Sequence, residues 1–357
     1  MKRDPSHTGA VATAPSDPPP DDPRQPVVTI EMVARAAGVS PSTVSRILNG
    51  TAVVSDAKAH AVEAAIARLG YVPNPVARGL AGGRTLSIGV VTQSLDSPFY
   101  GAALRGVEIA LQAAGYSPLF ISGQWNDREE QRCVAVLLAR RVDGIILLDA
   151  RLSDQALLEL ARALPVVVTG RTLAAPQLAS LSFDNFLGAC QATGHLLDLG
   201  HRRIAFIAGA ADHQDAVERQ RGFRHAMRAR RVAVDETLVV AGDYSEQSGA
   251  QAIEQLLGRG AEFTAVFAAN DQMALGAMLG LHRHKVAVPQ DVSVVGFDDL
   301  QAGHFCIPPL TSVHQPSHEM GQLAARAMVA LLSGERADLR LPEPRLIARD
   351  SSARRRA

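Results

Sequence analysis

The 357-residue chain has few lysines, few cysteines and no long apolar run, and each of these shortages excludes a class of protein. It contains three lysines and no G-x-x-x-x-G-K-S/T segment, so a phosphate-binding loop of that type is absent. Its three cysteines, Cys133, Cys190 and Cys306, have neither paired nor metal-type spacing, which favours reduced thiols in a cytoplasmic protein. No run approaches the roughly 18 apolar residues of a membrane span, and the N-terminus has no apolar signal core, so we expect no membrane partner.

Sequence motifs of catalytic sites are also missing. No G-x-S-x-G turn follows an apolar run, and the eleven histidines form no H-E-x-x-H pair for zinc. His282 and His284 are two residues apart and therefore face different directions on a helix. We expect a protein that is not an enzyme, with no catalytic residue, no bound metal and no cofactor.

The charge is balanced over the whole chain but uneven along it. Thirty-six basic residues are matched by thirty-six acidic residues, which excludes a general basic field for nucleic acid. In residues 28–84 six arginines or lysines face three carboxylates, a net charge of +3, and such a surface makes nucleic-acid binding salt-dependent. Residues 1–27 hold seven prolines and little core-forming content, which is typical of a disordered tail.

The segment Val28–Gly50, VTIEMVARAAGVSPSTVSRILNG, predicts two short helices joined by a tight turn. Thr29 is positioned to cap the first helix, and Gly38 begins the turn. Ser40 is positioned to cap the second helix, whose first residue is Pro41, where a missing N–H costs nothing. The apolar face of the first helix is predicted at Met32, Val33, Ala36 and Ala37.

The second helix carries a row of hydrogen-bonding side chains on its outer face. These are Ser42, Thr43, Ser45, Arg46 and Asn49. Side chains of this kind near the start of a second helix suit base edges and phosphates in a major groove. The alternative is an ordinary helical hairpin with a polar outer face.

A third helix is predicted to begin at Ser55 and Asp56 and to end at Gly70. The next segment, Tyr71–Gly83, reads YVPNPVARGLAGG, and Asn74 is positioned to cap a short helix in it. That helix has only about two turns, which is too few to be stable in isolation. It therefore needs another surface to fold against.

These residues resemble the DNA-binding region of the LacI/GalR family of bacterial transcription regulators. The matching motifs are TIEMVARAAGVSPSTVSRILNG, the Val54–Ser55 pair and GYVPNPVARGLAG. The resemblance implies a hinge helix that forms when two subunits meet over the operator, with Leu80 as a wedge in the minor groove. Asn74, Ala77, Arg78 and Ala81 would line the same groove. The expected set of DNA-contacting residues also includes Thr29, Ser40, Pro41, Ser55 and Tyr71.

The chain departs from the family pattern in two places. Ala59 stands in the first turn of the third helix, where the family often has a basic residue, so one phosphate contact is missing. The chain ends soon after LIARDSS without leucine heptads, so the resemblance implies a homodimer and not a tetramer built by a C-terminal bundle.

After Gly83 short apolar runs alternate with amphipathic helices, which predicts parallel sheets with helices on both faces. About 260 residues is long for one sheet, so we expect two lobes. The resemblance extends through ANDQMALGAM (269–278), VSVVGFDD (292–299) and IPPLTSV (307–313), and implies a core like a periplasmic sugar-binding protein. The expected fold is a small all-α helix-turn-helix head plus an α/β two-lobed, periplasmic-binding-protein-like (type I) core with parallel sheets.

The expected domains are a tail at 1–27, a head at 28–72, a hinge helix and linker at 73–84, an effector-binding and dimerisation domain at 85–350, and a basic tail at 351–357. The resemblance also implies chain crossings between the two lobes near Asp184, Gln315 and Pro342.

Ligands of such sheets bind beyond the carboxyl ends of the strands, and that rule selects a set of candidate residues. They are Gln93, Asp96, Phe99, Tyr100, Arg171, Arg219, Tyr244, Asn270 and Asp298, with Asp271 and Asp299 beside them. Carboxylate, amide, guanidinium and aromatic groups suit a polyhydroxy ligand, because each hydroxyl both donates and accepts. Matched by motif, Arg219, Tyr244, Asn270 and Asp298 fall on the family's effector-contacting positions.

Alternatives stay open for several of these residues. Asp271 and Asp299 also suit helix caps, Arg171 suits an ion pair, and Phe99 and Tyr100 suit an ordinary core.

The resemblance implies a cytoplasmic repressor of carbohydrate-metabolism genes that binds a near-palindromic double-stranded operator and responds to a sugar-like effector in the cleft. The alternative is a co-repressor-dependent regulator that responds to a non-sugar metabolite such as a purine. A periplasmic sugar carrier is disfavoured, because it has no use for residues 28–83 and needs an export signal.

Overall fold

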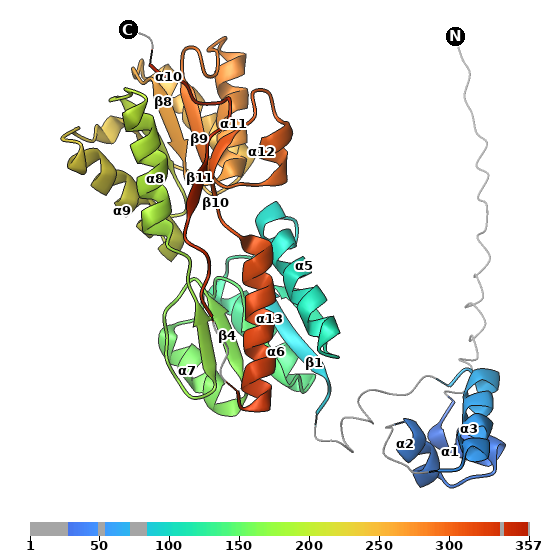
Figure 1. Ribbon diagram of the computed structural model, residues 1–357. Helices are drawn as coiled ribbons and strands as arrows, with labels where there is room; N and C mark the ends of the chain where they lie inside the picture. The colour runs from blue at the N-terminus through green and yellow to red at the C-terminus, as the bar shows by residue number, and fades with distance from the viewer. Residues whose placement is uncertain (1–27, 49–53, 72–83, 336–338, 356–357) are drawn as a thin grey trace, which may run out of the picture. The chain divides into compact units, whose positions relative to one another are not determined.

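A computed structural model of the protein describes residues 28–48, 54–71, 84–335 and 339–355. The chain forms two compact units that divide between Arg78 and Gly79, and each is described by itself (Figure 1). The first is a small helical head, and the second is a larger domain with two lobes.

Three helices form the head, namely α1 (Ile30–Ala37), α2 (Pro41–Leu48) and α3 (Asp56–Leu69). Helices of two to four turns are marginal in isolation, so their packing against one another carries most of their stability. The buried residues of their shared core are Val33, Ala34, Val44, Val62 and Ala65.

The buried face of α1 differs from the predicted one. Val33 and Ala34 are buried, and Ile30 and Ala37 pack against the same core. These four residues follow the i, i+3, i+4, i+7 spacing of one helix face. The prediction took Met32 and Ala36 in place of Ile30 and Ala34, but Met32 is 38% exposed and Ala36 is exposed as well.

Local interactions fix the turn between α1 and α2. Gly38 ends α1 with a φ of 65°, a left-handed conformation that glycine adopts without strain. The Ser40 hydroxyl accepts the N–H of Thr43 at 3.2 Å in the first turn of α2. Thr29 and Ser55 precede α1 and α3 without accepting a helix N–H through their side chains, unlike the predicted caps.

The first lobe of the larger domain contains a five-stranded parallel sheet in the order β2-β1-β3-β4-β5. Its strands are β1 (Ser87–Thr92), β2 (Ser117–Ser122), β3 (Gly144–Leu147), β4 (Val166–Thr169) and β5 (Leu178–Leu181). Its helices are α5 (Pro98–Ala113), α6 (Asp127–Ala139), α7 (Asp154–Ala163) and α13 (Ser317–Ser333).

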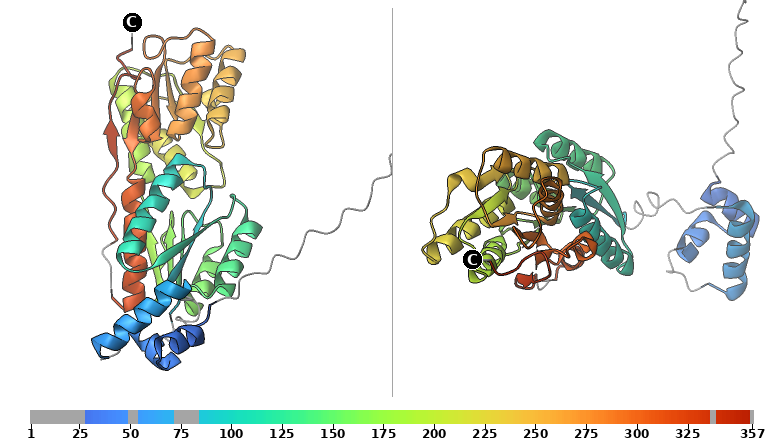
Figure 2. Two further views of the ribbon diagram at one scale, coloured as in Figure 1. Left: turned by 90° about the vertical axis from the view of Figure 1, so that its right-hand side faces the viewer. Right: turned by 90° about the horizontal axis from the view of Figure 1, so that it is seen from above.

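The strands of this sheet are apolar at nearly every position because both faces are covered. Val90 and Ile146 belong to the core cluster under α5 and α13, whereas their neighbours Val91 and Ile145 belong to the cluster under α6 and α7. Successive side chains of a strand point to opposite faces, so a sheet with helices on both sides needs continuous apolar runs. The two helices of the first face, α5 and α13, lie side by side (Figure 2).

The second lobe contains a six-stranded sheet in the order β11-β10-β9-β8-β6-β7. Its strands are β6 (Ile204–Ala208), β7 (Val239–Ala241), β8 (Ala265–Ala268), β9 (Ser293–Asp298), β10 (Thr311–His314) and β11 (Arg345–Ile347). Its helical elements are α8 (Asn185–Asp198), α9 (Gln214–Ala229), the 3₁₀ turn η1 (Glu236–Leu238), α10 (Glu246–Gly258), α11 (Asp271–Arg283) and α12 (Gln301–Phe305). The strands of this sheet pair in parallel, as expected, except that the edge strand β11 runs antiparallel to β10.

The chain passes between the two lobes in three segments, which join β5 to α8, β10 to α13 and α13 to β11 (Figure 1). Asp184, Gln315 and Pro342 lie in these three segments. The first lobe is therefore built from two separate stretches of chain, of which the second is α13.

Residues 351–355 pack on the second lobe, in contrast to the expected separate tail. Ser351 is buried, and its hydroxyl donates to the Val294 carbonyl at 2.6 Å and accepts the N–H of Thr311 at 2.8 Å. The Arg355 N–H donates to the Leu199 carbonyl at 2.9 Å. Residues 356–357, like residues 1–27, lie outside the described part of the chain.

Within the described ranges, no helix combines the length and the apolar character that crossing a membrane requires. The same residues contain no group of three or more histidine, cysteine, aspartate or glutamate side chains arranged to hold a metal ion.

Candidate functional site

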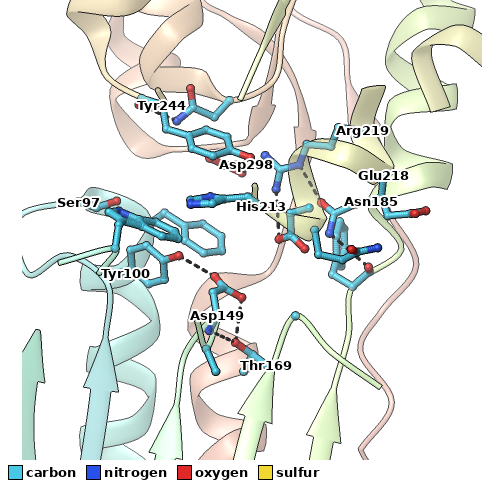
Figure 3. Close-up of a pocket in the computed structure, with 18 of the residues that line it drawn as sticks. Ser97, Tyr100, Asp149, Thr169, Asn185, His213, Glu218, Arg219, Tyr244 and Asp298 are labelled. Carbon is cyan, nitrogen blue, oxygen red and sulfur yellow. Dashed lines mark hydrogen bonds and ion pairs between the residues drawn. The ribbon is translucent and has the colours of Figure 1, made fainter. Parts of the chain in front are cut away.

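A cavity of about 1070 Å³ lies between the two lobes of the larger domain. Its walls come from the loops that follow the carboxyl ends of the strands in both sheets, where ligands of parallel sheets bind. Side chains from the two lobes converge on this space from opposite sides (Figure 3). The site is therefore a consequence of two sheets whose strand ends face each other.

Arg219 of α9 closes one side of the cavity and is nearly fully buried. Its Nε donates to Asn185 Oδ1 at 2.8 Å, and its Nη2 donates to Gln315 Oε1 at 2.8 Å. Its Nη1 donates to the Ala269 carbonyl at 2.6 Å and to Asp298 Oδ1 at 3.4 Å. The guanidinium is thus held at a single position, between β9 and two of the segments that join the lobes.

Two carboxylates lie beside this guanidinium, the buried Asp298 and the half-buried Asp215. Burial raises the pKa of Asp298 to about 7, although the positive charge of Arg219 acts in the opposite direction. Burial also raises the pKa of Asp215 to about 7, with a further contribution from the negative charge of Asp149. A ligand that donates hydrogen bonds to these oxygens would replace part of the solvation that burial removes.

Tyr244 supplies an unsatisfied polar group at the same place. Its backbone has a φ of 71°, and its ring lies above the cavity (Figure 3). Its hydroxyl is buried and has no hydrogen-bond partner among the described residues. Because buried hydroxyls are normally paired, this one is suited to a ligand or an ordered water.

The first lobe contributes a third carboxylate, Asp149, at the end of β3. Its Oδ2 accepts the hydroxyl of Tyr100 at 2.7 Å, and its Oδ1 accepts the hydroxyl of Thr169 at 3.1 Å. Tyr100 is held in turn by the ring of Phe99, with the two centroids 5.2 Å apart. Burial, followed by the Asp149 charge, raises the pKa of Tyr100, which keeps its hydroxyl protonated as a donor.

A stack of three rings crosses the cavity from one lobe to the other. Trp125 of the first lobe lies on His213 of the second with ring centroids 3.8 Å apart, and His213 lies 5.5 Å from Tyr244. Burial lowers the pKa of His213, which favours its neutral ring. Beside the stack, Arg151 Nη2 of the first lobe donates to Asp212 Oδ2 of the second at 2.7 Å. We call these two contacts, Trp125–His213 and Arg151–Asp212, the clasp.

Most of the predicted effector residues line the cavity. They are Asp96, Phe99, Tyr100, Arg171, Arg219, Tyr244, Asn270 and Asp298. Arg171 also forms the ion pair considered from the sequence, with Asp154 at 2.5 Å. Asn270 also caps α11, because its Oδ1 accepts the N–H of Met273 at 2.9 Å.

Gln93 differs from its prediction as a direct ligand contact. It is 1% exposed and does not line the cavity. Its Nε2 donates to Glu130 at 2.8 Å and to the Asp149 carbonyl at 3.0 Å, and its Oε1 accepts the N–H of Trp125 at 3.2 Å. The side chain therefore supports the loops that carry Trp125 and Asp149 and has no atom left for a ligand.

Several lining residues were missed from the sequence, chiefly Trp125, Asp149, His213 and Asp215. The signal that identifies them is the strand-end rule itself, because they follow β2, β3 and β6. Trp125, the only tryptophan of the chain, lies in the loop after β2 and satisfies this rule.

In the head, the predicted DNA-contacting residues of α2 lie on its outer side. Ser42 and Arg46 are exposed, and Thr43 and Ser45 are half-buried. The Ser40 hydroxyl is 2.9 Å from the hydroxyls of both Ser42 and Thr43. Thr29, Pro41 and Ser55 are exposed and Tyr71 is half-buried. The predicted contacts Asn49, Asn74, Ala77, Arg78, Leu80 and Ala81 lie outside the described residues.

Comparison with known proteins gives two family matches. Residues 29–74 match the family described as "Bacterial regulatory proteins, lacI family". Residues 193–352 match the family described as "Periplasmic binding protein-like domain".

Similar proteins match over nearly the whole chain. The HTH-type transcriptional regulator CelR of Thermobifida fusca is 41% identical over 315 residues, which cover 86% of this chain and 92% of CelR. A solved CelR–cellobiose complex has a TM-score of 0.68 and 39% identity, covering 91% of this chain and 100% of that one. The lac repressor dimer bound to operator and the anti-inducer ONPF has a TM-score of 0.81 and 32% identity, covering 91% of this chain and 99% of that one.

Proposed function

Because this chain belongs to the lacI family of bacterial regulatory proteins, we propose that it represses carbohydrate-metabolism genes and that a sugar-like effector in the interlobe cavity changes its affinity for its operator. The observation that carries the effector half of this proposal is the cavity, in which Arg219, Asp298 and the unpaired Tyr244 hydroxyl converge. The protein acts by binding alone, in the cytoplasm, without catalysis.

The head supplies the operator half. Ser42, Thr43, Ser45 and Arg46 form a polar outer surface on α2, and such a surface fits base edges and phosphates in a major groove. Leu80 inserts into the minor groove at the centre of the site, as the resemblance implies.

The effector is a hydroxyl-rich molecule. Carboxylate acceptors, a guanidinium and aromatic rings line one cavity, and this is the combination that sugar hydroxyls and sugar ring faces require. The CelR–cellobiose complex supports the same class of ligand, because CelR is 41% identical to this chain over 86% of its length.

The protein acts as a homodimer through the larger domain. Phe305 and Ile307 of the second lobe are 78% and 95% exposed, which is unusual for large apolar side chains and suits a surface that a second copy covers. The lac repressor, a dimer on its operator, is similar in structure and supports this assembly.

Arg219 links the effector to the rest of the domain. It bonds to Asp298 in the cavity and also to Asn185 and Gln315, which lie at two of the three segments between the lobes. A ligand that engages Asp298 therefore acts directly on a residue that is hydrogen-bonded to two of the segments that join the lobes. A coupling of about 1–3 kcal/mol, roughly 5- to 150-fold in operator affinity, is typical of such systems.

The test is selection of genomic fragments that the full-length protein binds, with and without candidate sugars. We expect a near-palindrome of two half-sites about one helical turn apart, and release of that fragment by one of the sugars. Fragments that are enriched only when a purine or another non-sugar metabolite is added would instead support the co-repressor alternative.

The site assignment is tested with Asp298→Ala on the recovered fragment. We expect operator affinity within about twofold of the wild type and loss of the sugar response, because this carboxylate lines the cavity of the larger domain. Asp198→Ala is the matched control, since Asp198 is an exposed carboxylate of the same lobe that pairs with Arg230. A sugar response retained by Asp298→Ala would refute the assignment.

A further inference from the structure

We propose that the effector carries no phosphate or carboxylate group, and that the cavity selects uncharged, hydroxyl-rich molecules over their anionic counterparts. This inference deepens the proposed function and rests on the cavity being the effector site.

The cavity is rich in negative charge. Ten aspartate or glutamate residues line it, against three arginines. Three of the carboxylates, Asp149, Asp215 and Asp298, lie in its interior and raise one another's pKa or that of a neighbour through their charges. The negative charge of an anionic ligand would be repelled by these carboxylates at short range, in a space where little water screens the charges.

The three arginines are already neutralised by these acids. Arg151 pairs with Asp127 at 3.2 Å and with Asp212 at 2.7 Å. Arg171 pairs with Asp154 at 2.5 Å. An anionic ligand would have to displace one of these carboxylates to gain an ion pair of its own.

Arg219 also offers little to an anion, because four of its five N–H groups are hydrogen-bonded within the protein and its charge is paired with Asp298. Its Nε, Nη1 and Nη2 atoms donate to Asn185, to Ala269 and Asp298, and to Gln315, and its Nη2 is also 3.9 Å from Asp215. Arginine has five N–H donors, and four of those of Arg219 are hydrogen-bonded to these partners, while Asp215 is an ion-pair partner beyond hydrogen-bond distance. The deepest positive charge of the cavity therefore serves its architecture.

Helix N-termini also bind anions, but the helix N-termini beside this cavity are capped by side chains or have a carboxylate nearby. The first turns of α8, α10 and α11 are capped by Asp184, Ser245 and Asn270. The first turns of α5 and α9 have no side-chain cap, but Asp96 precedes one of them and Asp215 lies within the other. Glu246 and Asp271 lie in the first turns of α10 and α11. A carboxylate therefore lies at the start of α8, α9, α10 and α11, where a phosphate would otherwise gain from the helix dipole.

The cavity offers an uncharged polyol hydrogen-bond partners without charge repulsion. The oxygens of Asp149, Asp215 and Asp298 accept hydrogen bonds, and the unpaired Tyr244 hydroxyl needs a partner. Sugar hydroxyls both donate to carboxylates and accept from a phenol, so one ligand satisfies both needs without adding charge.

The experiment titrates the full-length protein with matched pairs of sugars and follows the emission of Trp125, the only tryptophan in the chain. The pairs are cellobiose with cellobionate, glucose with glucose 6-phosphate, and ribose with ribose 5-phosphate. In each pair that binds, we expect the uncharged member to bind at least about tenfold more tightly, because like charges brought together are strongly disfavoured. Tighter binding of an anionic member would overturn the inference.

A substitution gives a second, independent readout. At pH 8, where Asp215 with its pKa of about 7 is mostly ionised, Asp215→Asn removes negative charge from the cavity, so the ratio of the two affinities within a pair should fall. Asp198→Asn, at the far end of α8 and outside the cavity, should leave that ratio unchanged. If Asp215→Asn weakens both members of a pair equally, Asp215 has a purely structural role and the charge argument fails.

The pH dependence has opposite signs for the two kinds of ligand. Below pH 7 Asp298 and Asp215 take up protons and lose acceptor strength. The affinity for an uncharged sugar should therefore fall between pH 8 and pH 6, by up to about tenfold for each carboxylate that must be ionised. The affinity for an anionic ligand should rise over the same range, because protonation of these carboxylates weakens the repulsion. An affinity for the anionic ligand that falls in parallel with that for the uncharged sugar would contradict the inference.

Operator binding, measured in parallel, separates this inference from the proposed function. Release of the operator by an anionic sugar would keep the function and refute the inference. Preference for the uncharged sugar without any change in operator binding would keep the inference and refute the function. If no member of any pair bound, both the inference and the effector half of the function would be contradicted.

Discussion

Asp298 is aimed into the cavity by a strained turn that other residues hold in place. Asp298 and Asp299 have φ values of 109° and 60°, which are unfavourable for residues with a side chain. Asp271, buried behind them, accepts the N–H of Leu300 at 2.6 Å and the hydroxyl of Ser312 at 2.5 Å. We therefore regard Asp271 as a positioning residue for Asp298.

Asp271→Ala removes the acceptor for the Leu300 N–H and lets the turn relax. Leaving such a group unsatisfied costs about 1–3 kcal/mol, so we expect effector affinity to fall by roughly 5- to 150-fold. Operator affinity without effector should stay within about twofold, because Asp271 belongs to the larger domain. Titration with the identified sugar and with the operator fragment measures both quantities.

Asp271→Asn is the control for that substitution. Burial raises the pKa of Asp271, so a neutral amide is a modest change, and its oxygen still accepts the N–H of Leu300. Effector affinity should therefore be largely retained. Equal losses in the alanine and asparagine variants would show that the hydrogen bond to Leu300 does not position Asp298.

The candidate site was predictable in part, and the residues show why. Asp298 follows from its position at the end of β9, where a parallel sheet exposes polar groups, and Arg219 follows from its motif and its place on the helix after β6. Gln93 satisfies the same rule, yet its amide is taken up by Glu130 and the neighbouring loops. Whether a side chain after a strand faces the cavity or supports a loop depends on contacts between distant segments, which local patterns do not encode.

At the scale of elements, the close approach of α5 and α13 holds the first lobe together. A methyl group added to Gly321 of α13 would overlap the carbonyl oxygen of Ala103 in α5. One added to Gly106 of α5 would overlap the carbonyl oxygen of His318 in α13. The two backbones touch through these glycines, although glycine lowers helix propensity by about 1 kcal/mol.

Gly321→Ala should destabilise the larger domain despite the better helix propensity of alanine. Overpacking at a rigid backbone contact costs about 1–3 kcal/mol, which exceeds the gain of up to about 1 kcal/mol. Gly101→Ala in α5 is the matched control, because no atom lies within 4 Å of the added methyl group. Chemical unfolding should give a less stable Gly321→Ala protein and an unchanged or more stable Gly101→Ala protein. Equal stabilities would contradict the steric explanation.

Elements with a long apolar run were predicted from the sequence, whereas short or partly exposed elements were not. The central strands of both sheets follow from their continuous apolar runs, because both faces are covered. β11 has only three residues, none of them fully buried, and its antiparallel pairing depends on a segment that returns from the first lobe. In α1 the choice between Met32 and Ala34 depended on where α2 and α3 pack, which periodicity alone did not settle.

At the scale of the whole larger domain, two kinds of contact relate the lobes. The chain segments at Asp184, Gln315 and Pro342 join them covalently, while the clasp joins them across the cavity. An ion pair with one partner as exposed as Asp212 contributes about 0.2–1 kcal/mol. An aromatic stack such as Trp125 on His213 adds about 0.5–1.5 kcal/mol. The free energy of the clasp contacts is therefore similar to the coupling free energy of about 1–3 kcal/mol that is typical of an effector, so effector binding could strengthen or break the clasp.

Asp212→Ala weakens the clasp, and Trp125 reports the result. We expect Trp125 emission to shift to longer wavelength, because loss of the Arg151 ion pair lets the ring leave His213 more often and meet water. Asp198→Ala, which breaks the surface pair with Arg230, should leave the emission unchanged. High salt screens exposed charges, so a higher salt concentration should reproduce part of the emission shift in the wild type and add little in Asp212→Ala.

An unchanged emission in Asp212→Ala would mean that the ring stack alone holds the clasp. Trp125→Leu should then be the substitution that alters the rate of effector entry.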